Sequence, residues 1–277
     1  MKADMGVGNK AKQGGEELAH AKTLGWLARA GLVARGVVYG IIGLLALKLA
    51  LGDGGKATNQ EGALQTIAHQ SFGELLLVLV AIGLGGYSLW RLVRAAVGHG
   101  AEQRDSTFDR ISALDSGIAY GILCITAIGI LTSSGGGGGS GSPKSTTGGV
   151  LDWTGGTLIV GIAGAILVGV ALYQLYEGLA KKFLEDAKTG EMSEGVEKAY
   201  TALGMFGIVA RAVIFALIGY GLIKAAIDYN PKEAIGLDGA LRELAHASYG
   251  PLLLGLVAAG LIGFGLYSIV DARYRKV

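Results

Sequence analysis

The chain has 277 residues, of which 51% are hydrophobic, 17% are charged and 49 are glycine, and its mean hydropathy is +0.48. So little charge cannot cover the surface of a soluble domain of this size, which indicates a membrane protein. The net charge of +2 comes from basic residues scattered along the chain, which excludes nucleic-acid binding through a basic patch.

The first 23 residues are polar and contain four lysines and two adjacent glycines. A secretory signal reaches its apolar region sooner and has a small-residue cleavage site after it. We therefore predict that residues 1–23 form a disordered tail that stays on the mature protein.

Six apolar stretches follow the tail, at residues 30–51, 72–96, 111–132, 156–178, 202–227 and 249–271. Each is close to the ~20 residues that a helix needs to cross a ~30 Å hydrocarbon layer. None alternates polar and apolar residues as a barrel strand does. The pattern predicts six transmembrane helices.

Lysine and arginine are distributed unevenly between the two sides of these helices. Eighteen lysines and arginines, Arg211 included, belong to the side that holds the tail, the connections after helices two and four, and the C-terminus. The opposite side holds six. Basic residues accumulate on the cytoplasmic side. We expect both termini in the cytoplasm.

A short phrase recurs three times in this chain. The first, third and fifth helices contain ARGVVYGIIG (34–43), SGIAYGILC (116–124) and ARAVIFALIG (210–219). Each has small residues four apart and an aromatic ring at the same place, namely Tyr39, Tyr120 and Phe215. Small residues at this spacing let neighbouring helix backbones pack closely in lipid.

The second, fourth and sixth helices share a phrase of their own. The glycine pattern aligns Gly83 and Tyr87 with Gly169 and Tyr173, and both with Gly260 and Phe264. The outer units also share an approach sequence, GALQTIAHQSFG from residue 62 and GALRELAHASYG from residue 239. The middle unit has TSSGGGGGSGSPKSTTGG at 132–149 instead, which predicts a flexible, exposed outer loop.

These patterns predict an all-α membrane protein built from three copies of one helical hairpin. The repeats are expected at residues 24–100, 101–190 and 191–277. Because two helices return the chain to its starting side, the three hairpins have the same topology. They should surround a pseudo-threefold axis along the membrane normal, unlike inverted repeats.

With these phrases the chain resembles a bacterial integral membrane family of unknown function, defined by a two-helix domain that occurs three times. The resemblance covers about residues 24–275. It implies six spans and a multi-pass protein of the bacterial plasma membrane. It implies no catalytic residue.

Arg35 and Arg211 are equivalent positions in the first and third repeats, and Ser116 replaces them in the second. In one interpretation the arginines bend back to the lipid headgroups, because Arg35 lies only ~5 Å inside the hydrocarbon. In the other, the two arginines and Asp115, next to Ser116, form a buried ion cluster near the cytoplasmic side. Its spare positive charge would bind a small anion or the phosphate of an anionic lipid.

His69 and His246 form a second symmetric pair, on the non-cytoplasmic side. Two histidines can ligate zinc or haem iron, but no Cys or His lies at ligand spacing from them. The alternative is a histidine at the end of a short amphipathic helix on the membrane surface. No cofactor is assigned.

The chain has no G-x-S-x-G elbow, H-E-x-x-H helix or Walker loop, so we expect no enzyme. Three functions fit this lipid-embedded chain. The first is a small pore, carrier or ion-site protein. The second is a structural or accessory protein that packs with lipids or with a partner complex. The third is a metal- or haem-binding protein that uses His69 and His246. The polar residues within the spans favour the first.

Overall fold

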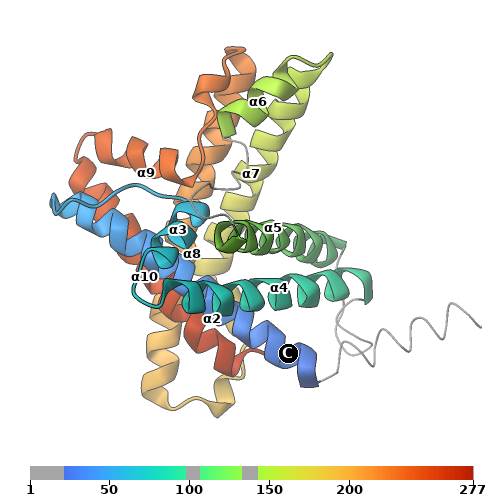
Figure 1. The fold of residues 1–277 in the computed structure, drawn as a ribbon, viewed down its shortest axis with the longest axis vertical. Helices are drawn as coiled ribbons and strands as arrows, with labels where there is room; N and C mark the ends of the chain where they lie inside the picture. The colour runs from blue at the N-terminus through green and yellow to red at the C-terminus, as the bar shows by residue number, and fades with distance from the viewer. Residues whose placement is uncertain (1–21, 98–106, 133–142, 277) are drawn as a thin grey trace, which may run out of the picture.

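The computed structural model describes residues 22–97, 107–132 and 143–276, and there the chain is almost entirely helical (Figure 1). Nearly all of the predicted tail 1–23 and the glycine-rich residues 133–142 lie outside the described residues. Each repeat contributes two long helices. They are α2 (Lys22–Leu51) and α4 (Gly73–Val97), α5 (Thr107–Thr132) and α7 (Gly156–Leu179), and α8 (Glu194–Ile227) and α10 (Gly250–Tyr274).

All six long helices are long and apolar enough to cross a membrane. The candidate spans are Gly25–Leu51, Gly73–Ala96, Ala113–Thr132, Gly156–Leu179, Glu194–Ile227 and Gly250–Tyr274. A helix pairs its backbone groups internally, which hydrocarbon requires. The predicted six apolar helices are confirmed, and they make this chain a multi-pass helical membrane protein.

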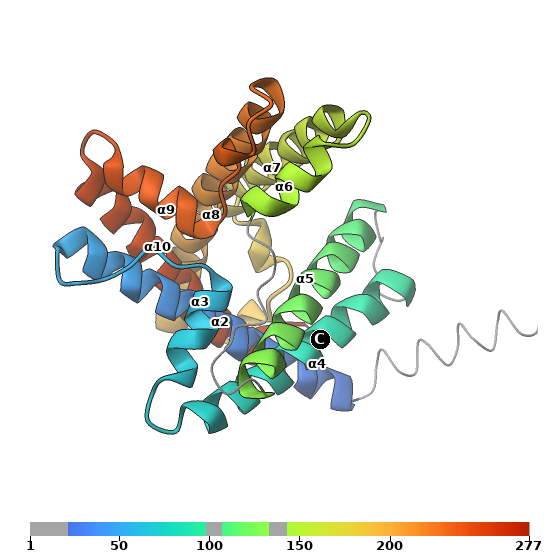
Figure 2. The same ribbon diagram turned by 45° about the horizontal axis from the view of Figure 1, so that its top comes forward.

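The helices pack mainly between repeats rather than within them. The three most extensively packed pairs are α2 with α10, α4 with α5, and α7 with α8. In each pair the second helix of one repeat lies against the first helix of another, and Figure 2 shows the three pairs around a common centre. Three equivalent pairs are the arrangement that three repeats of the same topology predict.

The middle repeat is more open than the outer two. α2 packs on α4 and α8 packs on α10, whereas α5 and α7 have no comparable contact. In Figure 1, α4 and α5 run across the view while α7 and α8 run up it. The packed helices therefore follow one another in the order α5, α4, α2, α10, α8, α7, and the two helices at the ends of this series lack the extensive contact that joins the others.

Glycines let the backbones of a helix pair approach closely. A Cβ atom on Gly36 would lie 2.6 Å from the carbonyl oxygen of Gly265, and one on Gly265 would lie 2.7 Å from that of Gly36. Gly164 and Gly219 meet in the same reciprocal way between α7 and α8. Because lipid gives no hydrophobic drive between helices, this close packing holds the pairs together.

The same contacts correct the alignment of the middle repeat. A Cβ on Gly219 of α8 would meet the carbonyl oxygen of Gly164, whereas one on the equivalent Gly43 of α2 would meet that of Ala258. Gly164 is therefore the counterpart of Ala258. The alignment predicted from the glycine pattern placed Leu167 there, three residues further on.

The starts of the second helices agree with this shift, because α4, α7 and α10 begin at Gly73, Gly156 and Gly250. Counting from these starts, Tyr173 is the counterpart of Trp90 and not of Tyr87. The predicted alignment was wrong because a glycine and an aromatic ring recur one turn later along these helices. The correction also makes residues 94, 177 and 271 equivalent.

A short helix precedes the second long helix of every repeat. These helices are α3 (Gln60–Ala68), α6 (Pro143–Leu151) and α9 (Leu237–His246), and a 3-10 turn, η3 (Pro231–Glu233), leads into α9. The predicted loop at 132–149 is thus wrong for residues 143–149, which are helical. The middle repeat keeps its short helix although its sequence there differs from the other two.

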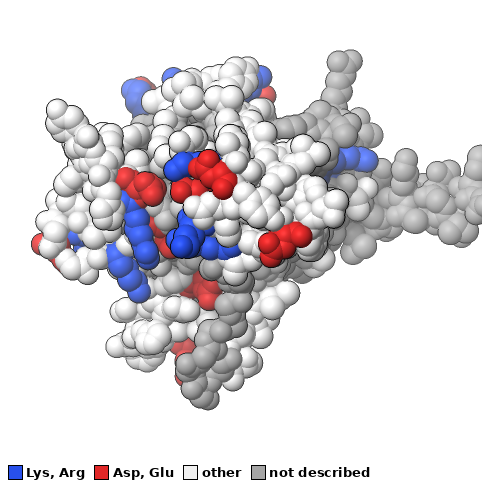
Figure 3. All heavy atoms as spheres, turned by 90° about the horizontal axis from the view of Figure 1, so that it is seen from above, with Lys and Arg blue, Asp and Glu red and all other residues white. Residues whose placement is uncertain are grey.

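The middle repeat also presents the most exposed long helices. Only 17% of the apolar core of α5 and 22% of that of α7 is buried, against 56% for α2 and α10. Seen from above in Figure 3, blue and red side chains lie side by side near the middle of the molecule, and further charged groups lie towards its edges. Lipid or a partner has most access to α5 and α7.

Candidate functional site

Arg35 points into the protein from α2 and is only 8% exposed. Its Nε donates a hydrogen bond to Oγ of Ser268 at 3.1 Å, and its Nη2 lies 3.8 Å from Oδ2 of Asp271. Ser268 and Asp271 are three residues apart and so lie on one face of α10. The charge of Arg35 on α2 is therefore neutralised by α10, the helix that packs most extensively against α2.

Asp271 is fully buried and has further donors. The hydroxyl of Tyr200 on α8 donates to Oδ1 at 2.8 Å, and Nη1 of Arg275 donates to Oδ2 at 3.2 Å. A buried carboxylate persists only with such compensation. Asp271 thus joins three helices through one side chain.

The chain of ion pairs continues to the connection between α7 and α8, which contains η1 (Lys182–Leu184) and η2 (Thr189–Glu191). Nη2 of Arg275 donates to Oδ2 of Asp186 at 2.8 Å. The backbone N–H of Lys188 donates to the carbonyl oxygen of Tyr274 at 2.7 Å. Burial lowers the pKa of Arg275, but the carboxylates of Asp271 and Asp186 outweigh it and raise the pKa well above its usual value. The C-terminus is therefore fastened to this connection.

Arg211, the counterpart of Arg35 on α8, has a different environment. Its guanidinium carbon lies 4.5 Å from the ring centroid of Phe264 and 5.4 Å from those of Tyr39 and Phe215. Its Nε is buried and has no hydrogen-bond partner among the described residues. Aromatic faces attract a cation, but they offer no acceptor atom for its N–H groups.

A cavity of about 110 Å³ adjoins Arg211 between α2, α8 and α10. Two short helices begin there, since Gln60 is the first residue of α3 and Leu237 is the first of α9. A helix N-terminus carries partial positive charge and free N–H groups. The other lining residues are Tyr39, Ile214, Phe215, Ile218 and Leu261. The cavity therefore combines one cationic side chain and two helix N-termini with mostly apolar walls.

The structure divides the predicted ion cluster. Arg35 and Arg211 both face the interior, but Asp115 is exposed on α5 and Ser116 beside it is half-buried. The acid that pairs with Arg35 is Asp271, so the predicted role of Asp115 is wrong. Asp115 and its neighbour belong to the more open middle repeat, where the pairing helix is α4 and not α10.

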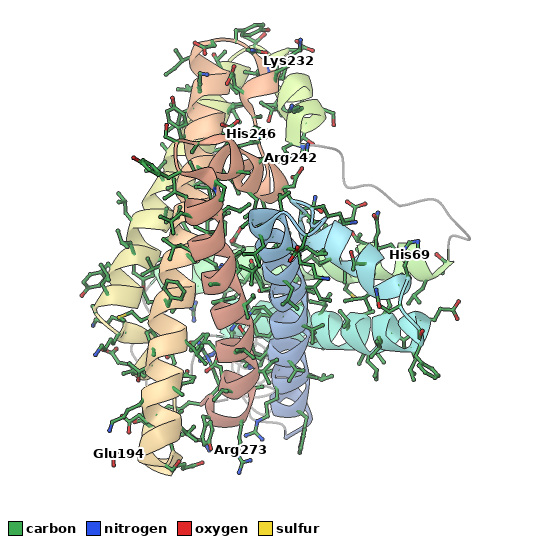
Figure 4. All side chains as sticks on the ribbon, turned by 90° about the vertical axis from the view of Figure 1, so that its left-hand side faces the viewer. His69, Glu194, Lys232, Arg242, His246 and Arg273 are labelled. Atoms are coloured by element: carbon green, nitrogen blue, oxygen red, sulfur yellow. The ribbon has the colours of Figure 1, made fainter. Side chains whose placement is uncertain are left out.

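The two histidines are exposed at the ends of α3 and α9, and Figure 4 shows them well apart. Nδ1 of His69 lies 2.6 Å from the carbonyl oxygen of Gln65, and Nδ1 of His246 lies 2.7 Å from that of Arg242. Within the described ranges no three His, Cys, Asp or Glu side chains form a group that could hold a metal ion. Metal or haem binding by this pair stays a prediction.

Asp271, Ser268 and Tyr200 were not identified from the sequence. A signal for Asp271 was present, because it is an acid at the end of an apolar stretch, four residues before Arg275. In the corrected alignment its counterparts are Glu177 and Arg94. All three repeats therefore place a charge at this position, which the first alignment obscured.

Taken with the fold, these features define a multi-pass helical membrane protein with charged residues in its interior. The family described as "Domain of Unknown Function (DUF1206)" matches residues 30–98, 111–181 and 206–275, once for each repeat, and the chain belongs to this family. It is 34% identical over 252 residues to "Uncharacterized protein YxxB" of Bacillus subtilis (strain 168), covering 90% of both chains. No solved structure matches the chain.

Proposed function

We propose that the protein binds a small anion at Arg211, as the interior site of a small carrier or pore. The observation that carries the proposal is the state of Arg211, whose buried Nε has no hydrogen-bond partner among the described residues and whose side chain lines a cavity. An uncompensated charge in an apolar interior costs several kcal/mol. An anion in the cavity would offset the charge and accept hydrogen bonds from the guanidinium group.

The comparison with Arg35 supports this assignment. Both arginines lie in equivalent places, yet among the residues that the structure describes only Arg35 has a carboxylate within 4 Å and a hydroxyl acceptor from the neighbouring helix. Charged groups within spanning helices face the interior and mark ion or substrate pathways. Arg211 is therefore the group available to an exchangeable ligand, and Arg35 is the group fixed in the structure.

Anion-dependent stabilisation of the purified protein in detergent tests the proposal. Sodium salts of nitrate, chloride, phosphate and acetate should include at least one anion that raises the unfolding temperature, because a ligand of the folded state stabilises it by mass action. Arg211→Gln should abolish the shift. Arg242→Gln, which removes the same charge from an exposed side chain, should retain it. Equal shifts in both variants would exclude the site.

Flux measurements separate a carrier or pore from a static ion site. Proteoliposomes should accumulate the stabilising anion faster than empty liposomes, and Arg211→Gln should remove the difference. If the anion binds but is not transported, the protein is a static ion-site protein and not a carrier or pore. The expected orientation, with both termini in the cytoplasm, is part of the same proposal and places α3 and α9, whose first residues line the cavity, on the outer side.

A second function is favoured by a separate observation. The exposed helices α5 and α7 leave a large apolar surface on the middle repeat, which a partner complex could cover in place of lipid. In this alternative the chain is an accessory protein, and a partner complex covers the apolar surface of α5 and α7. Light scattering of the protein in nanodiscs tests this alternative, because a stable partner or second copy would raise the mass above that of one chain.

A further inference from the structure

We propose that the cavity at Arg211 selects a small organic monoanion, a carboxylate with a short aliphatic tail. This inference rests on the proposed function and specifies the ligand of the same site. It is argued from the charge, the acceptor geometry, the volume and the walls of the cavity.

The charge of the cavity indicates a monoanion. Within the described part of the chain, Arg211 is the one formally charged residue that lines it. A dianion would leave one negative charge uncompensated among apolar side chains, which is costly. Gln60 and the N-termini of α3 and α9 add dipoles but no second full charge.

The donor set indicates a carboxylate. The guanidinium group is a planar fork that matches two carboxylate oxygens with parallel hydrogen bonds. Phosphate presents three or four oxygens that each require donors, and the polar side chains that line the cavity in the described ranges are those of Arg211, Gln60 and Tyr39. Two oxygens fit this number of donors better than four.

The volume limits the size of the ligand. A cavity of about 110 Å³ holds about four water-sized groups at ~30 Å³ each. A carboxylate with one or two further carbons fills it. Chloride would leave most of the apolar volume empty, and a six-carbon acid exceeds it.

The walls explain why an aliphatic tail is preferred. The aliphatic side chains that line the cavity together with Arg211 are Ile214, Ile218, Leu237 and Leu261. Each methylene moved from water to such a surface contributes ~0.8 kcal/mol, which corresponds to about fourfold in affinity. Affinity should therefore rise with chain length until the cavity is full.

Titration calorimetry of the full chain in detergent with sodium formate, acetate, propionate, hexanoate, phosphate and chloride tests the inference. We expect about fourfold tighter binding for each added methylene up to propionate, weaker binding of hexanoate, and no binding in Arg211→Gln. Arg242→Gln should bind as the wild type does. Phosphate or chloride binding as tightly as propionate, with the same dependence on Arg211, would overturn the inference and leave the anion site standing. If no anion binds through Arg211, the proposed function fails and this inference fails with it.

Ile218→Ala gives a second measurement that does not need the Arg211 variant to fold. Removing the side chain beyond Cβ enlarges the cavity, so the preferred chain length should move from propionate to butyrate or longer. A residue with a structural role alone would lower stability without changing this order. An unchanged order in a folded Ile218→Ala variant would also overturn the inference.

Discussion

Arg35 and Arg211 come from different repeats and both lie over the ring of Phe264, with guanidinium carbons 5.0 and 4.5 Å from its centroid. Two like charges beside one ring repel each other strongly in an apolar medium. Asp271 offsets the first charge. The second charge is offset by aromatic faces and, from beyond ion-pair distance, by the carboxyl group of Glu177, so Arg211 is the member of the pair without a direct carboxylate partner among the described residues.

Removing the acid alone should be more harmful than removing the ion pair. Asp271→Asn leaves Arg35 and Arg275 without their shared carboxylate, and we expect a loss of about 3–5 kcal/mol in the free energy of unfolding. In Asp271→Asn combined with Arg35→Gln the loss should be smaller, because no unpaired buried cation remains at position 35. Reversible unfolding in mixed detergent measures both. A double variant that is less stable than the single one would contradict the assignment of this pair.

The outer end of the same ion-pair chain should contribute little. Asp186 pairs with Arg275 at 2.8 Å, but its side chain is 54% exposed, so water and salt screen the interaction. Asp186→Asn should cost less than ~1 kcal/mol in the same unfolding measurement. A loss as large as that of Asp271→Asn would show that the C-terminal contact, and not the buried carboxylate, dominates the stability of this region.

The close approach of α2 and α10 should be sensitive to a single methyl group. In Gly265→Ala the new Cβ would lie 2.7 Å from the carbonyl oxygen of Gly36 and 2.9 Å from the backbone nitrogen of Gly40. Backbone atoms cannot rotate away, so the helices must separate, at a cost of about 1–3 kcal/mol. Gly255→Ala on the same helix is the control, because its Cβ meets only Ala50 at 3.9 Å. The two unfolding midpoints should differ clearly, with the control close to the wild type.

Much of the architecture was accessible from the sequence because it depends on local composition. Helix length, apolar content and the recurrence of small residues are read along one helix at a time, and these gave six spans and three repeats. The contact of Gly36 with Gly265 followed the same logic, since a small residue in a membrane helix indicates a close neighbour. The sequence does not tell which helix supplies that neighbour.

The site was harder to predict because it depends on register and rotation. Arg35 and Arg211 look alike in the sequence, but one faces a carboxylate of α10 and the other faces Phe264 and Tyr39. Asp115 was chosen as the partner because it is close in the aligned repeats, whereas the real partner is 236 positions from Arg35 along the chain, at Asp271. A shift of three residues in the alignment of α7 changes which charged residues of the three repeats are compared with one another. The sequence of one protein does not determine this alignment.

The expected orientation can be tested at residues that mark opposite ends of the molecule. Figure 4 shows Arg273 at one end with Glu194 and Lys232 at the other with Arg242, and the excess of basic residues predicts that the end of Arg273 is cytoplasmic. In a Cys124→Ser background, Lys232→Cys should react with a membrane-impermeant maleimide in intact cells, and Arg273→Cys should react only after the membrane is opened. Both side chains at these positions are exposed, so access to the reagent, and not burial, decides the result. Labelling of Arg273→Cys alone in intact cells would reverse the orientation and place α3 and α9 on the cytoplasmic side.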